Sequence, residues 1–308
     1  MRSLAEIYNA YFSSTAVFNY GEDERIFRTR FKRVWFVIFL LFMAITFVGS
    51  TFGIGANEYH YFIGNLILVN LIAAIGLNLL VGFTGLLSLG HAAFMGVGAY
   101  TSALLITKLA CPFSLSILLA GLVAALCGIV VGIPSLRIKG FYLMVATLAF
   151  QFVIEYVIIH WDSVTRGIRG IELPTPHLFS LSLEKNQTYF LFLFVLAVIL
   201  MWGAKNITRS KIGRAFIAIR DNDVSAEIIG ISIFRYKLLS FAISAFFAGI
   251  AGALFAGLLR TAIPEDYTFL HSILFLAMVL AGGLGRLVGT VFGVIFITLV
   301  PVLLDLLV

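Results

Sequence analysis

Hydrophobic residues fill most of the chain in long runs, and short polar stretches separate these runs. They predict membrane-spanning helices near 34–53, 62–82, 88–107, 113–133, 141–160, 189–203, 238–259, 268–282 and 289–307. A helix needs about 20 apolar residues to cross a bilayer, and a backbone in lipid must satisfy its hydrogen bonds within its own helix. The pattern therefore predicts an all-α polytopic bundle with about eight to ten spans.

Small residues recur at four-residue steps inside several of the predicted spans. They form three ridges, which are Ala245, Gly249, Ala253 and Gly257; Ala248, Gly252 and Ala256; and Gly285, Gly289 and Gly293. Such ridges let two helix backbones come close, and they favour packing inside one subunit over a contact between subunits. The Gly-rich stretches 82–98 and 282–293 each fit a continuous helix, a break or a re-entrant turn.

One polar segment, 204–237, interrupts this hydrophobic pattern. Inside its stretch KIGRAFIAIRDNDVSAEIIGIS (211–232), apolar residues follow helical spacing at Ile212, Phe216 and Ile219. Asp221 or Asp223 is expected to cap a second short helix near 224–229, where an acidic side chain also favours the helix dipole. Gly230 is the natural end of that helix.

The second helix of this segment is expected to carry a small apolar surface. That surface consists of Ala226, Ile228 and Ile229, with Glu227 beside it. An ordered knob of this kind fits the groove of a partner protein. An ordinary ordered loop lying on the lipid headgroups fits the same residues equally well.

The composition strengthens the membrane interpretation and narrows the chemistry. The chain is 61% hydrophobic and 12% charged, whereas a soluble domain is about 45–50% apolar and about 25% charged. Cys111 and Cys127 have no His or Cys at metal spacing, so they are expected to pack as small hydrophobic residues. The sequence has no GxxxxGK[ST], HExxH or GxSxG motif, so we expect neither an enzyme nor a cofactor site in this chain.

The positive charges predict the orientation rather than nucleic-acid binding. Basic residues crowd at 25–33, 137–139 and 205–237, and alternating the spans brings these three clusters to one face. The positive-inside rule makes this face cytoplasmic, with the N-terminus also inside. Residues 1–33 have no apolar stretch typical of a signal peptide, and both an interfacial amphipathic helix and a disordered tail fit them. Residues 34–308 then form the transmembrane domain.

A few polar side chains lie inside the predicted spans and are candidates to line a substrate path. They are Asn78, Ser88, His91, Gln151 and Glu155. Polar residues beside a helix break line the path in other transporters, and a carboxylate in the membrane normally faces a cavity or a partner. For His91 a hydrogen-bonded packing role is favoured over substrate contact. For Glu155, extension of the side chain to the membrane interface fits equally well.

Three long motifs in the same order resemble one known family. GLNLLVGFTGLLSLGHAAFMGVGAYTSALL (76–105), GRAFIAIRDNDVSAEIIGISIFRYKLLSFAISAFFAGIAGAL (213–254) and PEDYTFLHSILFLAMVLAGGLGRLVGTVFG (264–293) resemble the LivM/LivH-type permeases of branched-chain amino-acid ABC transporters, and the second motif resembles the LivM branch. The resemblance covers residues 62–308. It implies a subunit of a bacterial inner-membrane importer for branched-chain or other hydrophobic amino acids.

The resemblance also implies partners. They are a second permease, two P-loop ATPases that supply the energy, and an extracytoplasmic solute-binding protein. In this family the cytoplasmic loop holds a coupling helix that seats in the ATPase, and its counterparts here are Arg220, Asp221, Asp223, Ala226, Glu227 and Gly230. The sequence departs from the family at TRGIRG (165–170), where the family usually has a Gly-Gly-x-Asn-Gly-like run and this chain has Arg166 and Arg169 inserted. This loop should face the solute-binding protein.

Other functions are consistent with parts of the pattern. Relatives of the same branch import urea, amides or other small solutes. An ion-coupled secondary transporter would need more buried charge than Glu155 supplies. An intramembrane enzyme would need a cluster of nucleophile or metal-binding residues, which the sequence does not offer.

Overall fold

The computed structural model describes residues 58–135, 141–178 and 181–307. The predicted N-terminal segment 1–33, the predicted span 34–53 and the basic pair at 137 and 139 lie outside these ranges. Contacts divide the chain into Met1–His60 and Tyr61–Val308, and the second unit is the subject below.

Long helices make up this unit, as the hydrophobic runs predict. Their bounds are α4 Glu58–Asn78, continued by the π-helix η1 Leu79–Phe83, α5 His91–Leu109, α6 Phe113–Ser135, α7 Phe141–His160, α9 Asn186–Arg209, α12 Ile233–Leu259, α13 Phe269–Gly282 and α14 Leu287–Leu307. Within the described residues, six helices are long and apolar enough to cross a membrane, and the two shorter ones are Phe269–Gly282 and Leu287–Val302. The predicted all-α polytopic bundle is confirmed.

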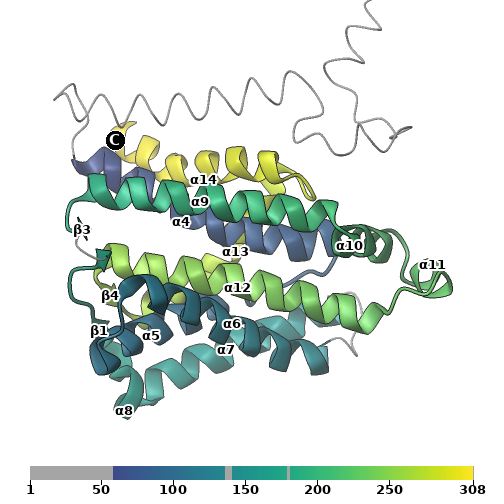
Figure 1. Cartoon of the computed structure of the whole chain (residues 1–308), viewed down its shortest axis with the longest axis horizontal. Helices are drawn as coiled ribbons and strands as arrows, with labels where there is room; N and C mark the ends of the chain where they lie inside the picture. Colours follow the sequence, from purple (N-terminus) through teal and green to yellow (C-terminus); the bar gives the residue numbers. More distant parts are fainter. Residues whose placement is uncertain (1–57, 136–140, 179–180, 308) are drawn as a thin grey trace, which may run out of the picture. The chain divides into compact units, whose positions relative to one another are not determined.

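Short elements gather at the two ends of the long helices (Figure 1). At one end lie α10 (Lys211–Asp221) and α11 (Asp223–Ile228), and we call it the α10–α11 end. At the other, the sheet end, lie α8 (Asp162–Thr165), the 3-10 helix η2 (Gly167–Arg169) and η3 (Pro264–Tyr267), with four two-residue strands. The strands β1 (Ile171–Glu172) and β4 (Thr261–Ala262) pair antiparallel, as do β2 (His177–Leu178) and β3 (Leu181–Ser182).

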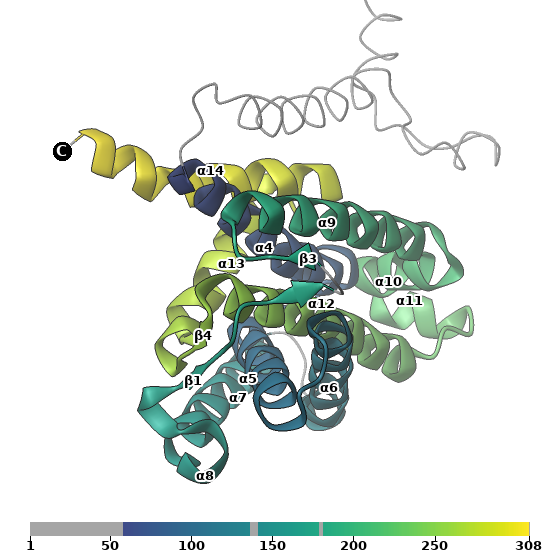
Figure 2. The same cartoon turned by 60° about the vertical axis from the view of Figure 1, so that its left-hand side comes forward.

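Helix α12 lies between α5, α6 and α7 on one side and α4, α9 and α14 on the other (Figures 1 and 2). At its small residues the neighbouring helices approach closely. A side chain at Gly249 would meet Ala120 and Ala124 of α6, and one at Gly252 would meet the Met95 backbone of α5. The expected close packing of the first two ridges inside one subunit is therefore confirmed.

The two Gly-rich stretches resolve as helix breaks rather than as continuous helices. The first lies between η1 and α5, where Gly85 has φ 74°, and the second lies between α13 and α14, where Gly283 and Gly285 have φ 92° and 73°. These left-handed φ values suit glycine, because it has no Cβ to clash with the carbonyl. Helices α13 and α14 then pack on each other, and a side chain at Gly289 would meet the carbonyl of Gly282.

Candidate functional site

Helix α10 is an amphipathic helix that packs on the bundle. Ser210 caps its start by accepting a hydrogen bond from the Ile212 amide at 3.1 Å. Phe216 is fully buried and meets the ring of Tyr236 edge-on at 6.5 Å between centroids. Because the apolar face is anchored in this way, the segment that follows begins from a fixed position.

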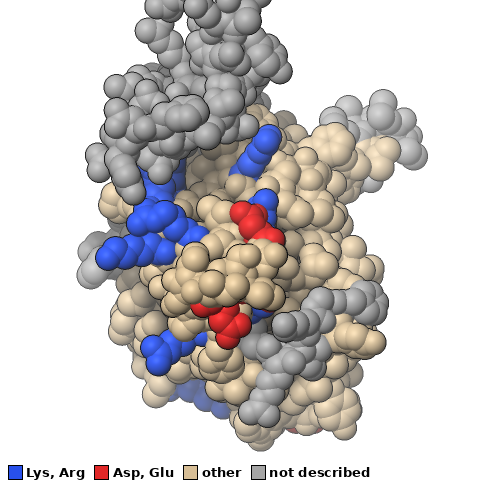
Figure 3. Space-filling view, turned by 90° about the vertical axis from the view of Figure 1, so that its right-hand side faces the viewer, with Lys and Arg blue, Asp and Glu red and all other residues tan. Residues whose placement is uncertain are grey.

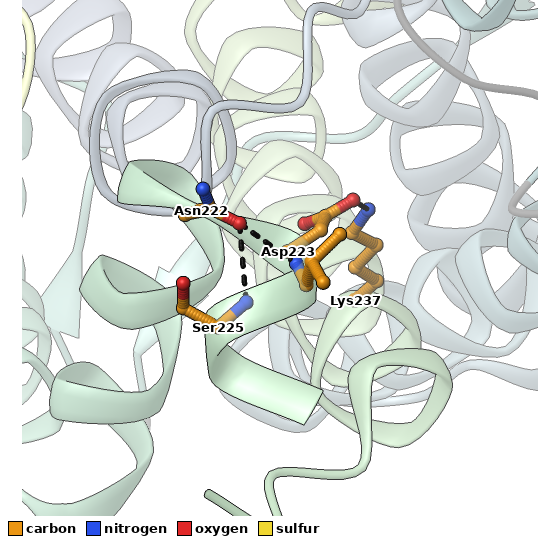
Figure 4. Close-up of polar contacts among 5 residues, drawn as sticks. Asn222, Asp223, Ser225 and Lys237 are labelled. Carbon is orange, nitrogen blue, oxygen red and sulfur yellow. Dashed lines mark hydrogen bonds and ion pairs between the residues drawn. The ribbon is translucent and has the colours of Figure 1, made fainter. Parts of the chain in front are cut away.

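The cap of α11 differs from the prediction. Asn222, and neither Asp221 nor Asp223, accepts the amide hydrogens of Val224 and Ser225, at 2.9 and 3.1 Å (Figure 4). Asp223 instead forms an ion pair with Lys237 of α12 at 2.7 Å. Asparagine caps helices as well as aspartate does, so Asn222 takes the position that the sequence analysis assigned to Asp221 or Asp223, and that prediction was wrong.

The end of α11 confirms the predicted role of Gly230, which has φ 87°. Its amide donates to the Glu227 carbonyl at 2.9 Å, and the Ile231 amide donates to the Ala226 carbonyl at 3.0 Å. These two bonds form a Schellman motif, which needs a left-handed residue at this position.

The apolar surface of α11 differs from the predicted one. Ala226 is buried, with 1% of its surface exposed, so it does not belong to an outward-facing surface. The exposed fractions of Val224, Ile228 and Ile229 are 63%, 79% and 72%. We call these three residues the α11 tip. The prediction placed Val224 inside the helix but did not count it as part of the apolar surface.

Charged side chains surround the α11 tip. Figure 3 views this end and shows an uncharged knob with acidic groups beside it and basic groups around it. The exposed charges here include Lys211, Arg214, Arg220, Asp221, Glu227 and Arg235. An apolar centre with a charged rim is the composition of a protein-binding surface.

Arg220 connects α10 to both helix breaks. Its Nη1 atom donates a hydrogen bond to the Gly82 carbonyl in η1 at 2.6 Å, and a side chain placed at Gly285 would touch the same guanidinium. Its 3.9 Å contact with Asp221 is exposed and therefore contributes little. The bond to Gly82 thus ties α10 to η1, in addition to the packing of Phe216 on the bundle.

Asn78 holds the two breaks together from inside the bundle. It is fully buried. Its Nδ2 donates to the Thr290 hydroxyl at 2.7 Å, and its Oδ1 accepts from the Gly285 amide at 2.9 Å. Both ends of the side chain are therefore engaged with the α13–α14 hairpin.

Among the other predicted path residues, Gln151 on α7 and His91 at the start of α5 are also engaged in packing. Gln151 is fully buried, donates to the Tyr267 carbonyl at 2.7 Å and accepts from the Ala93 amide at 2.7 Å. His91 bonds the Ala73 carbonyl through Nε2 at 2.8 Å, in the packing role favoured from the sequence. Ser88 is buried and accepts weakly from Gly90 at 3.4 Å, whereas Glu155 is partly exposed.

Another group of polar side chains, which the sequence analysis did not single out, lies near the sheet end. The hydroxyls of Tyr100 and Tyr267 and the Oδ2 atom of Asp266 are buried, and within the described ranges none has a hydrogen-bond partner. Burial, with a smaller contribution from the charge of Glu265, raises the pKa of the Asp266 carboxyl to about 6. The available signal was the PEDY sequence (264–267), an acidic pair between two spans.

The last question about these side chains is whether they could hold a metal ion. In the part of the chain that the structure describes, no three His, Cys, Asp or Glu residues come together in a way that could hold an ion.

The family comparison covers the same residues as the second unit. A family model described as "Branched-chain amino acid transport system / permease component" matches residues 61–308. The high-affinity branched-chain amino acid transport system permease protein LivM of Salmonella typhimurium is 33% identical over 272 residues, which are 80% of this chain and 64% of the relative. LivM of Escherichia coli is 35% identical over 247 residues, 72% of this chain and 58% of the relative.

The chain thus spans less than two thirds of the length of these two relatives. The ribose import permease protein RbsC of Bacillus subtilis is 32% identical over 108 residues, 33% of each chain. No solved structure matches.

Proposed function

The chain belongs to the family of branched-chain amino acid transport permease components. We propose that it is the membrane-spanning permease subunit of an ATP-driven importer, and that this importer carries branched-chain or other hydrophobic amino acids. The observation that carries this proposal is the α11 tip, an exposed apolar surface on a helix that is held firmly to the bundle. In this proposal the tip seats in a separate P-loop ATPase. A second permease completes the translocation path.

The proposed orientation places the α10–α11 end in the cytoplasm and the N-terminus on the same side. The basic residues around the tip support this orientation through the positive-inside rule. The sheet end then faces outward. There Ile168 is 70% exposed between Arg166 and Arg169, and this surface is proposed to receive the solute-binding protein.

The residues expected to couple the permease to the ATPase take different parts in this proposal. Asp223 fixes α11 to α12 through Lys237, while Ala226 and Gly230 pack and end the helix. Asp221 and Glu227 are exposed beside the tip and available to the partner. Arg220 transmits movement of α10 to η1 and so to the two helix breaks.

Leucine uptake in proteoliposomes that hold the chain with its membrane partners tests this function. With the solute-binding protein outside and ATP sealed on the α10–α11 side, we expect leucine to accumulate without any ion gradient. Removal of ATP should stop uptake, and an uncoupler should leave it unchanged. Uptake that ignores ATP but follows an ion gradient would instead establish a secondary transporter. Ribose, urea and amides serve as competing solutes, because a relative is named for ribose import.

An Arg220→Met variant tests the proposed connection between α10 and the breaks. Methionine keeps an apolar stem but loses the hydrogen bond to Gly82, and a bond from a charged donor is worth about 1.5–3 kcal/mol. We expect the ATPase to stay bound while ATP-driven uptake falls about tenfold or more.

The control for this variant is Arg214→Met on the same helix. Arg214 is exposed and bonds only weakly, at 3.3 Å, to the Arg209 carbonyl. Equal losses of uptake in both variants would mean that surface charge, and not the bond to Gly82, carries the effect.

A further inference from the structure

Three buried polar atoms converge near the sheet end without partners of their own. Tyr100 and Tyr267 expose 4% and 2% of their surfaces, and Asp266 beside them is partly buried. Neither hydroxyl, nor the Asp266 Oδ2, is hydrogen-bonded to any residue that the structure describes. Each buried polar atom left unpaired costs about 1–3 kcal/mol, so three at one place point to a bound group that satisfies them.

The backbone around this cluster is held in place. The 3-10 helix η3, which carries Asp266 and Tyr267, follows directly on β4, whose Ala262 pairs with Ile171 of β1. Gln151 donates to the Tyr267 carbonyl. Tyr100 comes from the middle of α5, so two separate elements bring the three side chains together.

The chemistry of the cluster fits a positive group. The rings of Tyr100 and Tyr267 lie 6.3 Å apart, and Phe255 lies 6.2 Å from Tyr267. Asp266 directly precedes Tyr267 in η3 and brings a carboxylate to the cluster. Among the described residues the ion pairs are Arg220–Asp221 and Lys237–Asp223, so Asp266 has no cationic side chain against it.

A carboxylate, two phenol oxygens and several aromatic rings are groups that attract an organic ammonium group. The carboxylate supplies the opposite charge, the hydroxyl oxygens accept hydrogen bonds, and ring faces attract cations. An anion would be repelled by Asp266. A hard metal ion prefers several carboxylate or carbonyl oxygens, and the described residues offer no such group.

We propose that Tyr100, Asp266 and Tyr267 bind the ammonium group of the transported amino acid. That the ammonium group belongs to a transported amino acid rests on the proposed function. That the site prefers a primary amine rests on the residues of the cluster alone. With the sheet end facing outward, an amino acid released by the solute-binding protein meets Asp266 at the outer part of the permease. The cluster does not include Asn78, His91 or Gln151, whose side chains form hydrogen bonds within the bundle. Gln151 contacts the cluster only through the backbone carbonyl of Tyr267.

The test measures binding to the full chain, purified with its membrane partners in lipid nanodiscs and without the soluble receptor. Three probes distinguish the charged groups of the amino acid. L-leucine has both groups, isopentylamine lacks the carboxylate, and 4-methyl-2-oxopentanoate lacks the ammonium group. We expect leucine and isopentylamine to raise the melting temperature in a saturable way and the oxo acid to have no effect. Sodium and ammonium chloride should also have no saturable effect.

Two variants place the binding at the cluster. Asp266→Asn should weaken leucine and isopentylamine at least about tenfold, because it leaves the ammonium without its counter-charge. Tyr100→Phe should weaken both while leaving the melting temperature of the unliganded complex equal or higher, since it removes an unpaired buried hydroxyl. The matched control is Glu265→Gln, an exposed neighbour of the same charge, which should bind as the wild type does.

Several results would overturn the proposal. Equal binding by the oxo acid, a saturable response to sodium chloride, or the same affinity in Asp266→Asn and Glu265→Gln would each exclude an ammonium site here. If these variants leave binding unchanged while ATP-driven leucine uptake persists, the ammonium site is wrong and the proposed function stands. If the amine binds through Asp266 but the chain drives no leucine uptake, the site stands and amino-acid import is wrong.

Discussion

Replacing Ile228 and Ile229 of the α11 tip by aspartate is expected to release the ATPase from the permease and to abolish ATP-driven uptake. The two side chains expose 79% and 72% of their surfaces, so the permease itself should fold normally. Burying one such side chain against a partner contributes about 1.5–3 kcal/mol, and placing a carboxylate in the same groove adds a desolvation cost. Together these effects should weaken docking by more than about 100-fold.

Co-purification from native membranes in mild detergent measures this loss. The control is Ile168→Asp at the sheet end, which alters an equally exposed isoleucine and should retain the ATPase. Retention of the ATPase by the Ile228→Asp, Ile229→Asp double variant would show that α11 is not the docking helix. The headgroup-bound loop that the sequence also allowed would then be the better interpretation of 211–232.

The long helices were predictable because the membrane imposes one simple requirement on every span. The predicted span 141–160 coincides with α7, and 113–133 falls two residues short of the end of α6. Larger differences arise where polar residues extend a helix beyond the apolar run. Helix α9 runs on to Arg209, and α12 begins at Ile233, five residues before the predicted 238.

Whether the Gly-rich stretches are helices or breaks could not be predicted from the sequence, because glycine has two opposite roles in them. Gly85 takes a left-handed φ and ends a helix. Gly98, 13 residues later, lies inside α5, where a side chain would meet the Gly249 backbone. Which purpose applies depends on whether a second helix crosses there, and that depends on residues about 150 positions away.

The roles of polar residues in the spans were also hard to predict, because their partners lie far away in the sequence. Asn78 was a candidate for the substrate path because it interrupts an apolar run, yet its partners are Thr290 and Gly285, more than 200 positions along the chain. A buried polar side chain needs a partner, but the sequence does not show whether that partner is protein or substrate. Asp266 was passed over because it lies between spans, where acidic residues are common.

The second large predicted effect is a loss of stability, and it follows from the close contact between α12 and α5. A Gly252→Val variant places a side chain against the carbonyl of Met95 and the amide of Ala99 in α5. Backbone atoms cannot rotate away as side chains do, so the two helices must separate. Overpacking costs about 1–3 kcal/mol where side chains can adjust, and we expect at least the upper end of this range here. The melting temperature of the purified permease should fall sharply, with less folded protein in the membrane.

The matched control is Gly203→Val in α9, where an added Cβ would meet no atom within 4 Å. Replacing a helical glycine by another residue usually gains a few tenths of a kcal/mol or more, because glycine loses the most backbone freedom on folding. The two variants should therefore shift the melting temperature in opposite directions, although the substitution is identical. A similar fall in both would mean that valine itself, and not the crossing of α12 over α5, destabilises these helices.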